Sequence, residues 1–413
     1  MKIISLLVTF IPCSEDNIKE QKMKITGLKS FAISMPMPAL GYSSPDGAGT
    51  KKEWGRSLRI TPHRPLPVLE YVIIVIDTDS GIRGIGEATP DVGFFGESLE
   101  EVKAAIDLYL GPKLIGVDPF DREWILNQLD YRGNYCAKSA IDLAIHDLIG
   151  KALGLPVYDL IGGRCRERVL VALEIPGGAP QDMAKACADY VKQGVRVFKP
   201  KIGGYPDADA ERLRAIREAV GKDVILRADA NQGYTPKEAI RLCRLAEKYD
   251  VGLELLEQPV PYWNLRGMAQ VRQAVDVLIE ADESAFTQHD VMNIIRNEAA
   301  DVINIKVEKV GGLYNAKKVA AMAESAGLEC VIGTAFGLGT TIAAKLHLAA
   351  STLIIKDAVE FTEIRLHDNL LAAPYDLLFS LPLEDGCLAV PSGPGFGVSI
   401  DDAKVAKYRA TIV

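Results

Sequence analysis

From about residue 168 onward, the sequence alternates between short β-type segments and helical segments, and this alternation constrains the fold more than any other feature. Eight β-rich segments recur at spacings of roughly 25 to 30 residues, the period of strand–helix units in a barrel. The eight are Val169–Glu174, Val197–Lys201, Val224–Asp229, Leu253–Glu257, Leu278–Asp282, Val302–Lys306, Glu329–Ile332 and Val359–Glu363. Helical patterns fill most gaps, as at Asp207–Val220, Pro236–Tyr249, Leu313–Ala326 and Thr341–Ala350. The repeat predicts an α/β fold with a closed barrel of the TIM type.

An open, doubly wound sheet is the alternative for such a strand–helix repeat. That fold usually has a glycine-rich phosphate-binding fingerprint after its first strand. No such fingerprint follows Val169–Glu174 in this sequence. The pattern therefore favours the barrel.

The N-terminal third has a different, α+β pattern. Strand-type segments at Ile25–Met35, Val68–Thr78 and Gly84–Ala88 precede helical segments at Ser98–Leu110, Asp121–Leu129 and Tyr135–Leu153. Between the first two strands, Ala39–Pro67 is rich in glycine, proline, serine and charge, which indicates a long loop of the kind that usually has a function.

These patterns divide the chain into four parts. Residues 1–22 are predicted to be an extension or an alternative start, because Met23 opens a second plausible beginning. Residues 23–155 are predicted to form an α+β capping domain, and residues 156–373 the barrel. Residues 374–413 are rich in proline and glycine, and we expect them to pack back on the capping domain.

Composition excludes several classes of protein. The formal net charge is −8, so nothing in the overall charge attracts the chain to nucleic acid or to anionic membranes. No apolar run approaches the roughly 20 residues that a membrane-spanning helix needs. Residues 3–11 resemble a short signal segment, but no cleavage site follows them. The seven cysteines are scattered and never spaced as CxxC, so we expect reduced thiols in a cytoplasmic protein.

Charged residues stand where the predicted strands end, which is where a barrel places its active site. The five ends, in chain order, are Lys199-Pro200-Lys201, Asp229-Ala230-Asn231, Glu257-Gln258-Pro259, Asp282-Glu283-Ser284 and Ile305-Lys306. Three adjacent strands thus direct Asp229, Glu257 and Asp282 to one volume. Like charges about 4 Å apart repel by several kcal/mol at intermediate dielectric, so this trio needs a cation. A hard divalent ion with oxygen ligands, Mg²⁺, satisfies that need best.

This ordered set of residues resembles the enolase superfamily, in particular its muconate lactonizing enzyme subgroup within the mandelate racemase/muconate lactonizing enzyme family. Gly86–Ala88, Arg132–Asn134 and Ala137–Asp142 agree with the resemblance, which extends over nearly all of residues 23–413. It implies a modified (β/α)7β barrel with an N-terminal α+β capping domain, and homo-oligomerisation.

The resemblance also implies roles for individual residues. Asp229, Glu257 and Asp282 would bind Mg²⁺, Lys201 would be the base on one face of the substrate, Lys306 would act on the other face, and Lys199 would support charge at the substrate carboxylate. A lysine can serve as a base if neighbouring cations lower its pKa towards neutrality, and the sequence predicts such a shift here. None of the five histidines stands at the end of the seventh strand, which argues against a histidine base.

Candidate substrate-binding residues lie around this predicted mouth. Asn231, Thr334 and Phe336 follow the third and seventh strands, and Glu360 or Glu363 on the eighth strand are candidates to hold a cationic nitrogen. From the capping domain, Trp54 and Phe95 are candidates to cover an apolar part of the ligand.

The sequence favours a racemase or epimerase that removes the proton α to a carboxylate through an enediolate, acting on an N-acylated, N-alkylated or cyclic amino acid. A dehydratase of a hydroxylated acid such as hydroxyproline, and a muconate-type cycloisomerase, are the alternatives. Phe336 stands near the place where muconate cycloisomerases have a glutamate, which weakens the last of these. The Asp-x-Asp motif that dipeptide epimerases have on their eighth strand is also missing from Val359–Arg365.

Overall fold

The computed structural model describes residues 23–36, 68–366 and 368–412. The predicted extension 1–22 and Trp54 lie outside the described residues. Among the described residues, no helix combines the length and apolar character that crossing a bilayer requires.

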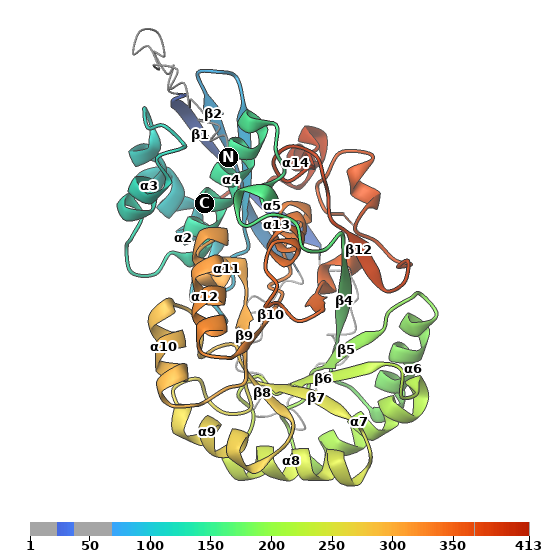
Figure 1. The fold of residues 1–413 in the computed structure, drawn as a ribbon. Helices are drawn as coiled ribbons and strands as arrows, with labels where there is room; N and C mark the ends of the chain where they lie inside the picture. Colours follow the sequence, from blue (N-terminus) through green and yellow to red (C-terminus); the bar gives the residue numbers. More distant parts are fainter. Residues whose placement is uncertain (1–22, 37–67, 367, 413) are drawn as a thin grey trace, which may run out of the picture.

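The N-terminal part is a three-stranded antiparallel sheet covered by helices (Figure 1). Its strands are β1 (Ile25–Pro36), β2 (Val68–Thr78) and β3 (Arg83–Ala88). Its helical segments are α2 (Leu99–Ala104), the π-helical turn η2 (Ala105–Leu110), η3 (Gly111–Leu114), α3 (Arg122–Gln128), α4 (Tyr135–Leu153) and α5 (Val157–Leu160). The single helix predicted at Ser98–Leu110 is therefore divided, with a π-helical second half.

The second part is a nearly closed barrel of eight parallel strands in the order β10-β9-β8-β7-β6-β5-β4-β11. The strands are β4 (Arg168–Ile175), β5 (Val197–Pro200), β6 (Ile225–Asp229), β7 (Leu253–Glu257), β8 (Leu278–Ala281), β9 (Val302–Ile305), β10 (Glu329–Ile332) and β11 (Ala358–Glu360). Beside β10, an isolated parallel bridge joins Cys330 to Ile355, shortly before β11.

Each of the first seven barrel strands is followed by a helix, which gives the predicted (β/α)7β arrangement. The helices are α6 (Pro180–Val191), α7 (Pro206–Val220), α8 (Pro236–Lys248), α9 (Leu265–Ala274), α10 (Gln288–Arg296), α12 (Leu313–Ser325) and α13 (Gly339–Ala350), with a short turn α11 (Val307–Val310) before α12. After β11 come η4 (Thr362–Arg365), η5 (Tyr375–Leu377), β12 (Cys387–Ala389) and α14 (Asp402–Tyr408). The eighth strand is shorter than the predicted Val359–Glu363, because η4 begins at Thr362.

Local sequence explains where these helices begin and which face they bury. In α8, Thr235 and Glu238 form a capping box, and Pro236 stands at the first turn, where its missing N–H costs nothing. The buried residues of α8 recur three and four positions apart, so that one stripe packs on the sheet. They are Ala239, Leu242, Cys243 and Ala246.

Two glycines of β3 let the capping sheet approach the long helix α4. A Cβ atom at Gly84 would lie 2.1 Å from the carbonyl oxygen of Ala144, and one at Gly86 would lie 1.9 Å from that of Ala140. Any larger residue would push the strand away from the helix. The position of β3 matters because Glu87, between Gly86 and Ala88, reaches the barrel.

The C-terminal residues contact both parts of the molecule. Strand β12 pairs antiparallel with β4 of the barrel, while Ala410 donates a backbone hydrogen bond of 2.8 Å to Ala32 in β1. Where the domains divide stays a prediction.

His347 joins α13 to the C-terminal segment in its neutral form. Its Nδ1 atom accepts a hydrogen bond of 3.0 Å from the backbone N–H of Tyr158, and Nε2 lies 3.1 Å from the carbonyl oxygen of Phe396, to which it donates. Burial lowers the pKa of His347 to about 4, because a second proton on Nδ1 would be desolvated and would face an N–H group.

This pairing predicts a loss of stability in acid. Between pH 6.5 and 4 the unfolded chain takes up a proton on this histidine and the folded chain does not, so the free energy of unfolding should fall by up to about 3 kcal/mol. Urea denaturation at pH 7 and pH 4.5 measures the change. A His347→Gln variant should show a smaller drop over the same interval, and an equal drop in both proteins would contradict the assignment.

Candidate active site

On six of the eight strands the interior of the barrel changes from apolar to polar over two residues, whereas β6 has the buried Arg227 two positions before Asp229. The lower layer contains Ala172, Val197, Leu255, Val302, Val331 and Ala358, all buried in two small apolar clusters. Side chains of a strand point to the same face at every second residue. Two positions further on, the same faces therefore present Glu174, Lys199, Glu257, Asn304, Gly333 and Glu360. The two-residue period of the strands therefore places polar side chains directly above the apolar ones in the barrel interior.

Lys199 lies at the centre of the first charged layer. Its Nζ atom donates to Glu257 and, at 2.6 Å, to Glu360, and lies 3.5 Å from Glu174. All four side chains are buried. Because each carboxylate comes from a different strand, this one ammonium group joins β4, β5, β7 and β11.

Lys201 and Lys306 stand one step further towards the open end of the barrel. Lys201 Nζ lies 2.6 Å from both Glu174 Oε1 and Asp229 Oδ2. Lys306 Nζ lies 2.6 Å from Asp282 Oδ2 and 4.1 Å from the centre of the Phe94 ring in the capping domain. Each lysine is therefore paired with an aspartate on another strand.

Two further residues hold Asp282 in place. Lys309 Nζ donates to Asp282 Oδ1 at 2.7 Å, to the Asp282 carbonyl at 2.9 Å and to the Asn304 carbonyl at 2.8 Å. The Gln258 side chain accepts the backbone N–H groups of Asp282 at 3.0 Å and Ser284 at 3.1 Å. These bonds fix the end of β8 against the ends of β7 and β9.

The paired carboxylates set the protonation of the lysines. Burial lowers the pKa of Lys201, but the charges of Asp229 and Glu174 outweigh burial and raise that pKa well above its usual value. The same competition, with Asp282 as the main anion, raises the pKa of Lys306. Neighbouring lysines do lower both pKa values, as expected, but the charges of the paired anions outweigh them. The predicted net shift towards neutrality is therefore wrong for the side chains as they are paired here.

Carboxylates outnumber ammonium groups in this cluster. Among the described residues it has four lysines, namely Lys199, Lys201, Lys306 and Lys309, against seven acids, namely Glu174, Asp229, Glu257, Glu280, Asp282, Glu283 and Glu360. Burial raises the pKa of Glu280 to about 8 although Lys199 opposes the shift, and burial followed by the charge of Asp282 raises the pKa of Glu283 to about 7. An additional cation would offset this excess of negative charge.

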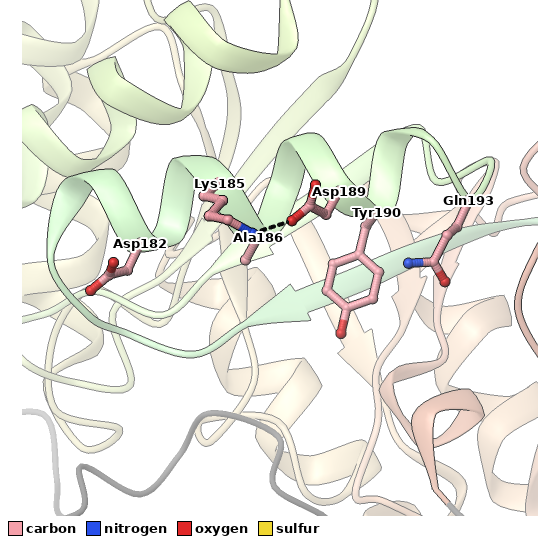
Figure 2. A pocket seen from close by; sticks show the side chains of 6 residues that line it. All are labelled: Asp182, Lys185, Ala186, Asp189, Tyr190 and Gln193. Atoms are coloured by element: carbon pink, nitrogen blue, oxygen red, sulfur yellow. Dashed lines mark hydrogen bonds and ion pairs between the residues drawn. The ribbon is translucent and has the colours of Figure 1, made fainter.

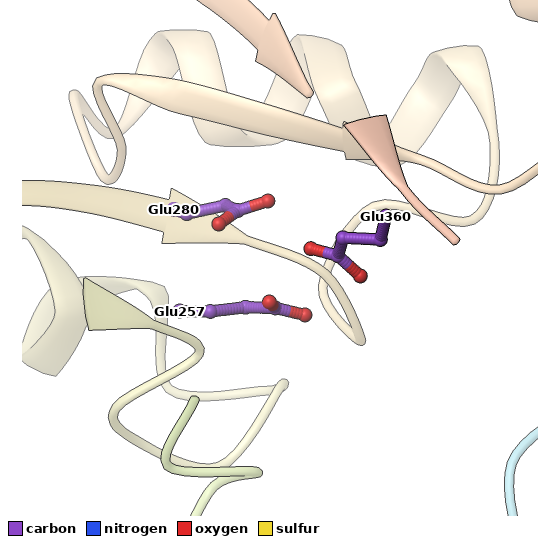
Figure 3. A group of neighbouring side chains, drawn as sticks. All are labelled: Glu257, Glu280 and Glu360. Atoms are coloured by element: carbon purple, nitrogen blue, oxygen red, sulfur yellow. The ribbon is translucent and has the colours of Figure 1, made fainter. Parts of the chain in front are cut away.

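The oxygen atoms fit a hard cation. Glu257, Glu280 and Glu360 each offer a carboxylate oxygen within 4.8 Å of the others, and Figure 3 shows the three side chains lying close together, from β7, β8 and β11. One carboxylate oxygen in each of Glu280, Glu283 and Glu360 is buried and accepts no hydrogen bond from the described residues. Buried carboxylate oxygens are the ligands that Mg²⁺ prefers. Of the predicted ligands, Glu257 belongs to this close group, while Asp229 and Asp282 are paired with Lys201 and Lys306 one layer above.

The candidate substrate residues lie in two places. Asn231 follows β6 and donates from Nδ2 to Glu283 at 3.3 Å. Thr334 and Phe336 lie in the loop after β10, where Thr334 Oγ1 donates to Glu363 at 2.6 Å and accepts the Phe336 N–H at 3.1 Å. Phe95 is buried in the core of the capping domain, and its neighbour Phe94 is the residue that reaches Lys306.

The two acids predicted on the eighth strand are already paired with lysines, although Glu363 lies in η4 and not in β11. Glu360 binds Lys199, and Glu363 accepts a 2.6 Å hydrogen bond from Lys345 in α13. Sequence reasoning missed Glu174, Glu280 and Lys309. For Glu174 and Glu280 the signal was the two-residue period of the strands, since each stands two positions after an inward-facing apolar residue.

A shallow hollow elsewhere does not belong to this site. Figure 2 shows it along α6, where its lining consists of Asp182, Lys185, Ala186, Asp189, Tyr190 and Gln193. None of these residues contributes to the charged layers of the barrel interior.

Comparison with known proteins identifies relatives of this arrangement. A family model described as "Enolase C-terminal domain-like" matches residues 182–404, and the N-terminal domain model of the mandelate racemase/muconate lactonizing enzymes matches residues 66–162. An L-Ala-D/L-Glu epimerase of Clostridium acetobutylicum is 37% identical over 340 residues, or 82% of this chain and 93% of that protein. An N-succinyl-L-Arg/Lys racemase of Bacillus cereus is 33% identical over 383 residues, or 92% and 96%.

A solved structure shows the same architecture with ligands bound. The dipeptide epimerase of Enterococcus faecalis, complexed with Mg and the dipeptide L-Leu-L-Tyr, superposes with a TM-score of 0.80 and is 31% identical. The superposition covers 91% of this chain and 99% of that one.

Glu257 gives a direct test of the cation fit. Replacing Glu257 with Gln removes one negative charge from the centre of the acidic group, so we expect the affinity for Mg²⁺ to fall by at least about 100-fold. Isothermal titration calorimetry measures this without any substrate. Glu211→Gln, which changes a surface acid paired with Arg214, is the matched control and should bind as the wild type does. Unchanged affinity in Glu257→Gln would rule out a cation at this place.

Proposed function

Because the chain belongs to the mandelate racemase/muconate lactonizing enzyme family of the enolase superfamily and is an isomerase, we propose that it is a Mg²⁺-dependent racemase or epimerase. The proposed reaction moves the proton on the carbon α to a carboxylate, and the proposed substrate is an N-substituted or cyclic amino acid. The epimerase and racemase among its relatives support this choice of reaction.

One observation carries the proposal. Lys201 follows β5 and Lys306 follows β9, and these strands are four positions apart in a barrel of eight. The two lysines therefore face each other across the barrel. Of the three strands between them, β6 ends in Asp229 and β7 in Glu257, and Asp282 directly follows β8. A molecule lying at the mouth of the barrel would have one lysine on each face and carboxylates along one side.

This arrangement suits inversion at a carbon atom. Removing a proton from one face and returning one to the other needs two acid–base groups on opposite sides. In the proposed reaction Lys201 takes or gives the proton on one face and Lys306 does so on the other, so that either enantiomer can enter. Lys199, which is fully buried and already binds two glutamates, has no freedom to do the same and would support charge at the substrate carboxylate.

The proposed cation would stabilise charge on the substrate carboxylate. Asp229, Glu257 and Asp282 would hold Mg²⁺, which when bound neutralises the negative charge that develops on the substrate carboxylate as the α-proton leaves. If Asp229 and Asp282 held the ion, their oxygens would no longer be paired with Lys201 and Lys306. Since Asp229 and Asp282 are the anions that raise the pKa of Lys201 and Lys306 most, the same exchange would lower both pKa values and favour loss of a proton from either lysine.

Replacing each lysine separately tests the two-base arrangement. Lys201→Ala and Lys306→Ala should each lower the rate of racemisation by at least about 10²- to 10⁴-fold, because inversion needs both groups. Proton NMR in deuterated water, on a panel of N-substituted and cyclic amino acids, measures the rate. Each variant should still exchange the α-proton of one enantiomer, since one face keeps its base.

Lys185→Ala is the matched control, because Lys185 lies on the surface of α6 and pairs only with Asp189 among the described residues. A Lys306→Ala variant that racemises at the wild-type rate would refute the two-base proposal. Loss of water from a hydroxyproline, without inversion, would instead show that the enzyme is a dehydratase.

A further inference from the structure

Glu308 is a fully buried acid that follows Lys306 closely in the chain and accepts no hydrogen bond from any other residue that the structure describes. It stands in the short turn α11, two residues after Lys306, and none of its surface is exposed. Neither carboxylate oxygen accepts a hydrogen bond from another of the described residues. Burial raises the pKa of Glu308, because a buried carboxylate without a donor from another residue is costly. A cation placed beside its oxygens would favour the charged form.

The charged groups around Glu308 are already engaged. Its closest electrostatic neighbours are Lys345 of α13, Glu363 of η4 and Lys306, and it also acts on Glu87 of β3. Lys345 donates to Glu363 and to the carbonyl of Glu360, and Lys306 donates to Asp282.

The other neighbouring acid, Glu87, is satisfied too. It accepts the N–H of Leu338 and the N–H and hydroxyl of Thr341, so it is held by the start of α13. Of the two ammonium groups that act on Glu308, Lys345 donates to Glu363 and Lys306 donates to Asp282. This region has an excess of negative charge, and Glu308 is the member whose oxygens are unoccupied.

The loop after β10, which lies next to this region, is held firmly in position. Phe336 has a φ of 60°, and its carbonyl accepts a 2.8 Å hydrogen bond from the Tyr71 hydroxyl of the capping domain. At Gly333 an added Cβ would lie 2.8 Å from Cε of Lys306, so the loop backbone touches the proposed base. The acids Glu87, Glu308 and Glu363 therefore lie beside a loop that is held in place next to Lys306.

We propose that Glu308 is the counter-ion for a positively charged nitrogen of the substrate and so determines its specificity. The inference rests on the proposed function, and it narrows the substrate class. An ammonium group would satisfy the unoccupied oxygens of Glu308 and offset the local excess of acid. A substrate with a second carboxylate, or with a neutral acylated nitrogen, would leave Glu308 buried and unpaired.

Two kinds of substrate would bring a protonated amine close to the reacting carbon. The nitrogen is either the alkylated or cyclic α-nitrogen of a single amino acid, or the N-terminus of a short peptide. Three probes with the same leucine side chain separate these cases: N-methyl-L-leucine, L-alanyl-L-leucine and N-acetyl-L-leucine. At neutral pH the amine nitrogen of the first two is protonated and cationic, whereas the acetylated nitrogen of the third is a neutral amide.

The test compares α-proton exchange of the three probes by the wild type and by Glu308→Gln. Glutamine keeps the size of the side chain and removes its charge. We expect kcat/KM for the better cationic probe to fall by about 100-fold or more, as when one partner of a buried charge pair is lost. The value for N-acetyl-L-leucine should change by less than about 3-fold, since in this case no charge pair is removed. Which cationic probe is preferred identifies the source of the nitrogen.

Glu329→Gln is the matched control, because Glu329 is an exposed acid at the start of β10 and pairs with Lys356. It should react with every probe as the wild type does. An equal fall for the cationic and neutral probes in Glu308→Gln would overturn the inference and make Glu308 a structural group.

If Glu308→Gln does not fold, binding of the probes to the wild type tests the role of Glu308 instead. Calorimetry should show tighter binding of a cationic probe than of N-acetyl-L-leucine, and the opposite order would overturn the inference. Exchange of N-acetyl-L-leucine alone would refute the role of Glu308 and leave the proposed function intact. If no probe and no member of the wider panel exchanges its α-proton, the proposed function is itself wrong, and this inference fails with it.

Discussion

The buried contact between Lys199 and its carboxylates is the interaction on which the rest of the site depends. An ammonium group in an apolar barrel is strongly destabilising unless anions surround it, and Glu257 and Glu360 bind it directly while Glu174 lies close by. These three acids come from strands on both sides of β5, so pairing with Lys199 fixes their side chains relative to one another. Lys201 then has Glu174 as one of its two anchors, and the acids of β7 and β8 lie next to the Lys199 pairs.

The capping domain completes the site through a small number of contacts. Glu87 accepts hydrogen bonds from the first residues of α13, Tyr71 holds the loop after β10, and Phe94 lies over Lys306. Gly84 and Gly86 make this possible, because their lack of side chains brings β3 against α4 and sets the position of Glu87. Reactivity at the barrel mouth is thus connected to the packing of a sheet that lies outside the barrel.

Much of the fold could be predicted because its signals are local. The strand–helix period gave all eight barrel strands, and residue types at the strand ends gave Lys201, Asp229, Glu257, Asp282 and Lys306 as residues of one cluster. The pairing within that cluster could not be predicted in the same way. Glu174, Glu280 and Lys309 belong to the cluster because of the inward direction of their side chains and the order of the strands. Phe95 was a reasonable candidate by type, but the core of the capping domain buries it.

The sequence by itself determined the order of strands and helices, the alternation that places polar residues above apolar ones in the barrel interior, and the residue types at the mouth of the barrel. These follow from periodicity and composition, which act over a few residues at a time. Only the tertiary structure decided which acid pairs with which lysine, and therefore in which direction each pKa moves. It also decided that Glu363 pairs with Lys345, while the oxygens of Glu308 accept no hydrogen bond from the other described residues. The physical reason is that Coulomb energy depends on distances between residues far apart in the chain, and closure of the barrel alone sets those distances.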